Sequence, residues 1–310
     1  MNKTCTKTIF LSIFFAMAVS AASAWCATFG AGDAAYQRGD YAQAHAVMHT
    51  LAALGDARAQ ANLALMYRSG KGVNQDYAQA AQWYRLAAEQ GDAGGQFGLG
   101  YCYEEGQGVV RDHAEALKWY RLAADQGHAL AQVNLGAIYA AGRGVPQDYA
   151  TASHWHRLAA EKGHAAGQYN LGVIYDSGHG VAPSPAEALK WYRLAAAQGE
   201  TNALNNLAVM YDKGRGVAED PGEASRLYRL AAIQGNAESQ NNLGVLHATG
   251  RGVAEDNVRA YMWFTLSIEG GDPHAAINRG TVTESMSPQQ IAEAQRLAQA
   301  CKQQRLRGCD

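Results

Sequence analysis

A 36-residue repeat constrains the fold of this chain more than any other feature of its sequence. A glycine closes each repeat, and these glycines are Gly55, Gly91, Gly127, Gly163, Gly199, Gly235 and Gly271. A Gly-x-Gly-Val motif keeps the same spacing and begins at Gly70, Gly106, Gly142, Gly178, Gly214 and Gly250. The spacing predicts six full repeats over residues 56–271. One repeat cannot bury its apolar face alone, so the stack is the expected folding unit.

Each repeat is expected to form two helices joined by the glycine loop. In the first repeat these helices cover residues 57–69 and 77–90, and Leu63 and Tyr67 share one face of the first helix because they are four residues apart. A carboxylate that can cap a helix precedes five of the second helices, at Asp76, Asp112, Asp148, Asp220 and Asp256. The fourth repeat starts its second helix with Ser184, Pro185 and Glu187 instead, which is a capping box. The fold class predicted is all-α.

The Gly-x-Gly loop also suggests a phosphate-binding loop, but a structural role explains it better. Gly70 and its equivalents follow the end of a helix, where glycine supplies a left-handed cap. The carbonyl end of a helix carries partial negative charge, which does not attract a phosphate. A tryptophan that recurs in the second helices is likewise expected to pack in the core, at Trp83, Trp119, Trp155, Trp191 and Trp263.

The two ends of the chain differ from the repeats. Residues 1–24 carry Lys3 and Lys7, an apolar run and an Ala22-Ser23-Ala24 site, which together predict a cleaved signal peptide. A retained membrane anchor and a lipoprotein attached through Cys26 are the alternatives. Residues 25–55 are expected to form an N-terminal capping helix pair, and residues 272–310 to form C-terminal capping helices that begin their last helix at Ser287.

Charge and cysteine content limit the partners and the compartment. The formal charge is −2 for the whole chain, and removal of Lys3 and Lys7 leaves 24 basic against 28 acidic residues, or −4. This charge argues against a nucleic-acid partner. Export places the mature protein in an oxidising compartment, either the periplasm or the medium, which permits disulfides. We expect Cys301 to pair with Cys309 because they are close in sequence; free thiols are the alternative.

The repeat resembles a known family. Residues 128–163 read HALAQVNLGAIYAAGRGVPQDYATASHWHRLAAEKG, and this pattern is similar to the Sel-1-like repeat, a relative of the tetratricopeptide repeat. The resemblance implies a right-handed α-α superhelix of helix-turn-helix units that serves as a scaffold for protein complexes. The chain departs from the pattern at Leu204, where other repeats have Gln, and at His247, where they have Tyr.

Sequence signals for catalysis are poor. The chain has no Ser-x-x-Lys, Gly-x-Ser-x-Gly or His-Glu-x-x-His motif, and the Cys pair per repeat found in Sel-1-like proteins linked to penicillin binding is absent. His45 and His49 lie four residues apart, but the sequence offers no evident third metal ligand. We therefore expect no catalytic residue, no cofactor and no metal.

Amide and aromatic side chains of the first helices are the candidate binding residues. One asparagine stands immediately before the leucine column of the first helices, at Asn62, Asn134, Asn170, Asn206, Asn242 and Asn278, although Arg279 replaces the leucine after Asn278 and the second repeat has Gly98 in place of the asparagine. An amide both donates and accepts, as a peptide bond does, so this column suits an extended peptide; bonding within the repeats is the alternative. In tetratricopeptide repeats the first helices line a concave groove, and the resemblance implies that six further side chains point into it: Phe97, Tyr101, Tyr169, Asn202, Asn205 and Asn241.

These observations predict an exported scaffold that binds a protein or peptide on its concave face and that has no membrane span after signal cleavage. One alternative is a secreted factor that engages host-cell proteins through the same groove. A second alternative is a cell-wall enzyme such as a penicillin-interacting hydrolase, which binding of a fluorescent penicillin would reveal.

Overall fold

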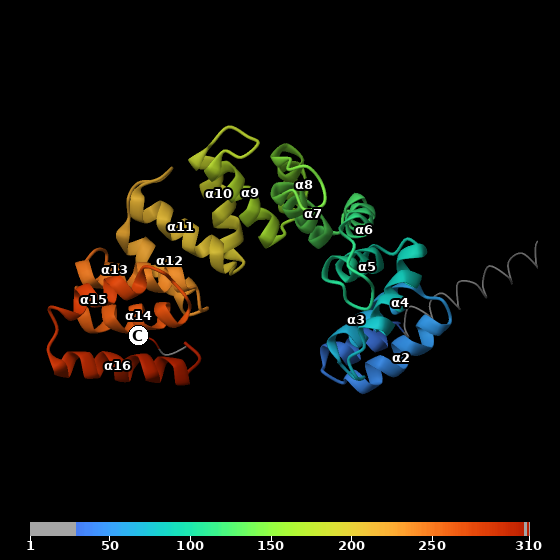
Figure 1. The fold of residues 1–310 in the computed structure, drawn as a ribbon, viewed down its shortest axis with the longest axis horizontal. Coiled ribbons are helices and arrows are strands. Elements are labelled where there is room, and N and C mark those ends of the chain that lie inside the picture. The colour runs from blue at the N-terminus through green and yellow to red at the C-terminus, as the bar shows by residue number, and fades with distance from the viewer. Residues whose placement is uncertain (1–28, 307–308, 310) are drawn as a thin grey trace, which may run out of the picture. The chain divides into compact units, whose positions relative to one another are not determined.

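The computed structural model describes residues 29–306 and residue 309, and these residues form helices and loops with no β-strand (Figure 1). The chain divides into two compact units, Met1–Pro146 and Gln147–Asp310, whose boundary lies in the glycine loop of the third repeat. The expected signal peptide, residues 1–24, lies outside the described residues. No helix of the described part is long and apolar enough to cross a membrane.

The first unit begins with the capping pair and continues into the repeats. Residues 29–37 are helical and precede α2. The labelled helices of this unit are α2 (Tyr41–Ala53), α3 (Ala57–Ser69), α4 (Tyr77–Glu89), α5 (Ala93–Glu105), α6 (His113–Asp125) and α7 (Ala129–Ala141). Each helix contacts the next one in sequence, and α3 also contacts α5. The unit is therefore a stack of antiparallel helix pairs.

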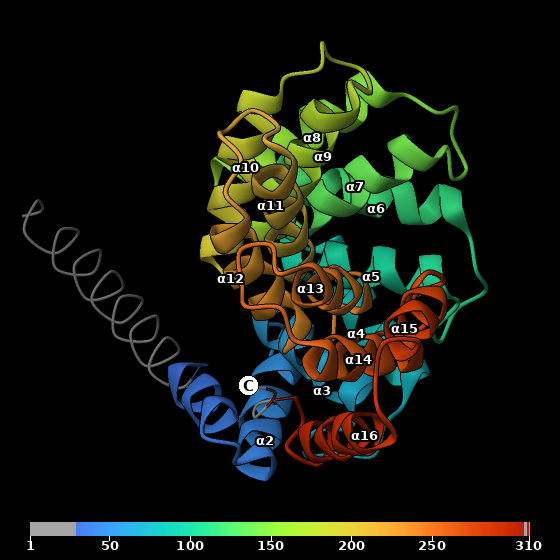
Figure 2. The same cartoon turned by 90° about the vertical axis from the view of Figure 1, so that its left-hand side faces the viewer.

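The second unit repeats this arrangement and ends in the C-terminal helices. Its repeat helices are α8 (Tyr149–Glu161), α9 (Ala165–Ser177), α10 (Pro185–Ala197), α11 (Thr201–Lys213), α12 (Pro221–Ala232), α13 (Ala237–Thr249) and α14 (Asn257–Glu269). Two further helices follow, α15 (Ala275–Thr283) and α16 (Pro288–Gln303). Both cartoon views show α16 beside α14, and the two helices are in contact (Figures 1 and 2).

Local sequence explains where the helices begin and end. The expected carboxylates cap the second helices, as when Asp76 Oδ1 accepts a hydrogen bond from the Gln79 backbone amide at 2.9 Å. Ser287 and Gln290 form the expected capping box at the start of α16. Gly70 ends α3 in the left-handed conformation, with φ 66°. The second loop glycine, Gly72, packs so tightly on the preceding pair that a Cβ there would lie 2.2 Å from the Tyr41 carbonyl oxygen.

A ladder of buried glutamines joins successive repeats. Gln60 donates to the Ala52 carbonyl at 3.2 Å, and it accepts from Gln90 of the same repeat at 2.7 Å. The same pair recurs as Gln96 with Gln126, at 2.8 Å. The two buried glutamines, Gln60 and Gln96, thus bond to a backbone carbonyl of the preceding pair and to a side chain of their own repeat, as buried amides require.

The C-terminal end is closed by a disulfide between Cys301 of α16 and Cys309. Their Cα atoms are 4.9 Å apart, inside the range that a bridge allows. Cys102, which lies in α5, is buried and unbridged. The bridge holds the last described residue against α16.

Candidate peptide-binding site

The predicted asparagines all lie half-buried on first helices of the pairs. We use "first-helix site" for these residues together with the six predicted aromatic and amide neighbours. The members in the first unit are Asn62, Phe97, Tyr101 and Asn134. The members in the second unit are Tyr169, Asn170, Asn202, Asn205, Asn206, Asn241, Asn242 and Asn278.

Most of the column amides contact a side chain in the preceding second helix, 14 residues earlier. Asn206 Nδ2 donates to the Tyr192 hydroxyl at 3.1 Å, and Asn170 Nδ2 lies 3.5 Å from His156 Nδ1. Burial raises the pKa of the Tyr120 and Tyr228 hydroxyls. A hydrogen bond from the asparagine of the next repeat acts to lower the pKa of each hydroxyl: Asn134 bonds to Tyr120, and Asn242 bonds to Tyr228. These four amides therefore help to hold each repeat on the one before it.

The first and last asparagines of the column have different neighbours. Residue 264, which precedes Asn278 by 14, is a phenylalanine without a hydroxyl, and Asn278 donates to Asn241 Oδ1 at 2.8 Å instead. Residue 48, which precedes Asn62 by 14, is a methionine. The Asn62 amide makes no hydrogen bond to any described residue, and it lines an open pocket of about 200 Å³. Asn62 is thus the column member whose polar atoms remain available to a ligand.

The three predicted aromatic residues are half-buried, and each ring lies against a neighbour. Phe97 stacks on His128 with ring centroids 4.7 Å apart. The Arg68 guanidinium lies 4.7 Å from the Tyr101 ring centroid, which is cation–π geometry. In the second unit, Tyr169 lies 6.1 Å from Tyr192. These contacts fix the rings in the stack while leaving part of each surface exposed.

Two of the predicted amides are buried, which corrects the expectation that they point into an open groove. Asn205 is 3% exposed, and its Oδ1 accepts a hydrogen bond from Ser239 Oγ at 2.8 Å. Asn241 is 7% exposed and accepts from Asn278. Both lie where successive first helices meet, so their polar groups are used between repeats. Asn202, by contrast, is exposed.

One column of large buried side chains was not predicted from the sequence. One ring of the second helix is buried in every repeat, directly after the tryptophan in five repeats and after Leu227 in the fifth, and the column comprises Tyr84, Tyr120, His156, Tyr192, Tyr228 and Phe264. It faces the small residues of the first helices: a Cβ added to Gly100 would lie 2.8 Å from the Tyr120 ring. The helical glycines therefore make room for a ring. The four-residue spacing from Ala80 to Tyr84 was the signal that could have identified this column.

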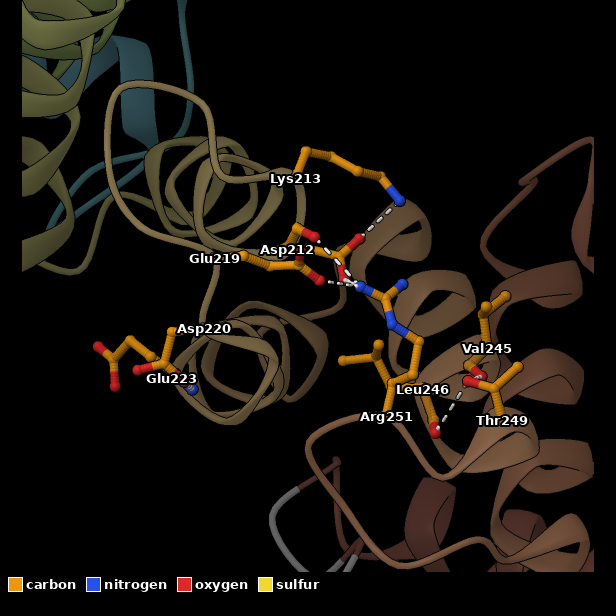
Figure 3. Close-up of polar contacts among 9 residues, drawn as sticks. All are labelled: Asp212, Lys213, Glu219, Asp220, Glu223, Val245, Leu246, Thr249 and Arg251. Atoms are coloured by element: carbon orange, nitrogen blue, oxygen red, sulfur yellow. Dashed lines mark hydrogen bonds and ion pairs between the residues drawn. The ribbon is translucent and has the colours of Figure 1, made fainter.

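Ion pairs that link loops to earlier helices were also missed. Arg251, in the glycine loop after α13, donates to the backbone oxygen of Asp212 at 3.2 Å, and its Nη2 lies 3.1 Å from Asp212 Oδ1 (Figure 3). The same guanidinium pairs with Glu219 at 2.9 Å (Figure 3). Equivalent pairs join Arg143 to Glu104 and Arg215 to Asp176. In these two pairs, and in the pair of Arg251 with Asp212, the acid stands 39 residues before the arginine, a spacing that was present in the sequence.

The two histidines considered as metal ligands pack against aromatic rings. His45 lies 5.8 Å from the Tyr67 ring, and His49 lies 6.4 Å from the Trp83 ring. Across residues 29–306 and Cys309, no group of three potential ligand side chains comes together.

Comparison with known proteins identifies the repeat. The family profile described as "Sel1 repeat" matches residues 57–92, 93–128, 129–164, 165–200, 201–236 and 237–272. A crystal structure of a Sel1 repeat protein from Oxalobacter formigenes is 33% identical, with a TM-score of 0.70, over 77% of this chain and 96% of that one. No curated protein sequence matches the chain significantly.

Two further solved structures match at lower TM-scores. One is a protective antigen present in uropathogenic Escherichia coli strains displaying an SLR fold, with 27% identity, a TM-score of 0.35, and coverage of 91% of this chain and 85% of that one. The other is an immunity protein from Pseudomonas aeruginosa, with 19% identity, a TM-score of 0.44, and coverage of 69% and 81%. The family profile and the structure from Oxalobacter formigenes agree with the helix pairs described above, and the chain therefore belongs to the Sel1 repeat family.

Proposed function

We propose that this protein is an exported scaffold that binds an extended segment of a partner protein along its first-helix site. Sel1 repeats generally mediate protein interactions, and no catalytic family is indicated for the chain. The observation that carries the proposal is the set of half-exposed aromatic rings on first helices, each held by a neighbour. Tyr101 beneath Arg68 is the clearest case.

Rigid rings favour binding for an energetic reason. Ordering a flexible side chain on binding costs roughly 0.5–1.5 kcal/mol, and a ring already fixed by its neighbours avoids most of that cost. Aromatic residues also dominate the binding energy of many interfaces. Phe97 and Tyr169 are fixed in the same way by His128 and Tyr192. The charge of the mature chain, −4, supports a protein partner rather than a nucleic acid.

Site-specific photo-crosslinking would test this proposal in cells that export the protein. A photoreactive amino acid placed at residue 101, 169 or 202 is expected to capture the partner. The controls are residues 122 and 194, which are exposed leucines of second helices. Capture from the control positions with none from the first-helix positions would place the partner on another face.

The nature of the captured protein would also separate a periplasmic adaptor from a secreted factor that engages host proteins. The proposed location, periplasm or medium, rests on the charged leader, the apolar run and the Ala-Ser-Ala site in residues 1–24.

A further inference from the structure

A pocket opens at the N-terminal end of the first unit. Its volume is about 200 Å³, several times the roughly 30 Å³ that one water molecule occupies in the liquid. Three segments supply its walls: the helix at residues 29–37, α2 and α3. The lining residues are Asp33, Tyr36, Gln37, Met48, Asn62, Leu65 and Met66.

The equivalent space two repeats further along the chain is filled by a tyrosine. The Tyr120 ring packs where Gly100 leaves room, 2.8 Å from a Cβ built there. Its hydroxyl donates to Glu104 Oε2 at 2.7 Å and hydrogen-bonds with Asn134. A carboxylate and an amide thus hold the phenol from two sides.

Met48 occupies the same position in the capping pair. It precedes Asn62 by 14 residues, as Tyr120 precedes Asn134. It also faces a small residue of the preceding helix, because a Cβ on Gly32 would lie 3.0 Å from Met48 Cε. Methionine has neither the ring nor the hydroxyl of tyrosine, so the outer part of this space stays open. The Asn62 amide, which has no bond to a described residue, borders that space.

We propose that this pocket accepts a tyrosine side chain of the bound partner, which takes the place of the tyrosine that the capping pair lacks. The phenol hydroxyl accepts a hydrogen bond from the Asn62 amide and donates to the exposed Asp33 carboxylate. The thioethers of Met48 and Met66 contact the ring, an arrangement that is favourable for sulfur and aromatic groups. The inference rests on the proposed function, since it names the side chain that one end of the first-helix site recognises.

Tyrosine is preferred over phenylalanine for a physical reason. A phenylalanine ring that entered the pocket would cover the Asn62 amide without offering it a partner, and a buried polar group left unpaired is costly. Sites built around a hydroxyl reject ligands that lack it much more strongly than apolar pockets reject an extra methylene.

The direct test uses N-acetyl-tyrosinamide and N-acetyl-phenylalaninamide as probes of the mature full-length chain. Titration followed by NMR is expected to shift the Asn62 side-chain amide signals with the tyrosine probe, at a dissociation constant on the order of millimolar for so small a ligand. The phenylalanine probe is expected to bind at least tenfold more weakly. Equal binding of the two probes, or no binding of either, would overturn the proposal.

Three variants sharpen the test. Met48→Tyr supplies the missing ring from within and is expected to reduce binding of the tyrosine probe at least tenfold. Met48→Leu leaves the space open and should retain binding, which controls for disturbance of α2. Asn62→Ala is expected to remove the preference between the two probes. Unchanged binding in Met48→Tyr would show that the probe sits elsewhere.

The chain's own N-terminal segment is the competing occupant. Trp25 lies four residues before the first described residue, and if it filled the pocket, the probe would bind a Trp25→Ala variant but not the unaltered protein. That result would overturn the proposal.

Partner crosslinking from residue 169 in a Met48→Tyr protein distinguishes failure of the tyrosine pocket from failure of the proposed scaffold function. If crosslinking persists while the probes fail, the scaffold function stands and the tyrosine pocket does not.

Discussion

The asparagine column shows that one residue type takes different roles according to its neighbour. Where a tyrosine stands 14 residues earlier, the amide is used inside the stack, as with Asn206 and Tyr192. Where a methionine stands there, as before Asn62, the amide stays available. The role of each asparagine therefore depends on a residue in another helix.

This difference predicts unequal effects of the same substitution on stability. Asn206→Ala removes the donor to the Tyr192 hydroxyl and is expected to destabilise the protein by about 1 kcal/mol. Asn62→Ala breaks no such bond and should cost less than about 0.5 kcal/mol. Urea unfolding followed by circular dichroism measures both. Equal costs would mean that Asn62 also serves the stack.

The buried histidine of the aromatic column makes stability depend on pH. Burial lowers the pKa of His156 to about 4, while an unfolded chain binds the proton near pH 6.5. Because the unfolded state binds more protons between these values, stability is full above about pH 6.5 and falls as the pH drops toward 4. The loss attributable to this group is on the order of 3 kcal/mol.

Replacing that histidine by the residue found in other repeats should remove the effect. His156→Tyr is expected to flatten the decline in unfolding free energy between pH 6.5 and 4, measured by urea unfolding at several pH values. His154→Gln, at an exposed position of the same helix, is the control and should leave the slope unchanged. An unaltered slope in His156→Tyr would assign the acid sensitivity to other groups.

At the scale of the elements, the glycine loop has two structural roles. It reverses the chain between the helices of a pair, and its middle residue reaches back to the previous pair, as Arg251 does to Asp212 (Figure 3). Asp212 is 6% exposed, so its charge is largely removed from water. A buried carboxylate needs its partners, and this arginine is one of them.

Removing that arginine should therefore cost more than removing an exposed one. Arg251→Ala is expected to destabilise the protein by about 1–2 kcal/mol, because Asp212 loses two contacts while keeping the Lys213 ion pair. The comparison is Arg226→Ala in α12, whose ion pair with the half-buried Glu223 lies at the surface and should contribute roughly 0–0.5 kcal/mol. Thermal unfolding by calorimetry would rank the two. Similar losses would show that the loop pair is no stronger than a surface pair.

At the scale of the whole molecule, nearest-neighbour stacking is the organising feature. Within each of the two units, successive helices bury the aromatic and alanine columns between them; α2 of the capping pair packs on α3, and α16 packs on α14. A protein built this way tolerates changes of surface residues within each repeat, because the core columns carry most of the stability. One position of the first helices can therefore carry different residues in different repeats, as Phe97 and Tyr169 differ from Asn205.

The exported form is expected to begin at Trp25. Cleavage after Ala24 follows from the order of charged leader, apolar run and small-residue site. N-terminal sequencing of protein recovered from the periplasm or the medium checks it. Recovery of membrane-bound protein that still begins at Met1 would support the retained anchor instead.

The sequence by itself determined the all-α class, the repeat boundaries and the helix caps. These are local properties: a left-handed glycine such as Gly70 and a capping carboxylate such as Asp76 act within a few residues of where they stand. Only the tertiary structure decided which polar side chains are free. Asn205 is buried because Ser239 of the next repeat meets it, and Asn62 is available because residue 48 is not a tyrosine. Burial of these amides depends on residues 14 to 34 positions away, on another helix, so spacing within one helix does not reveal it.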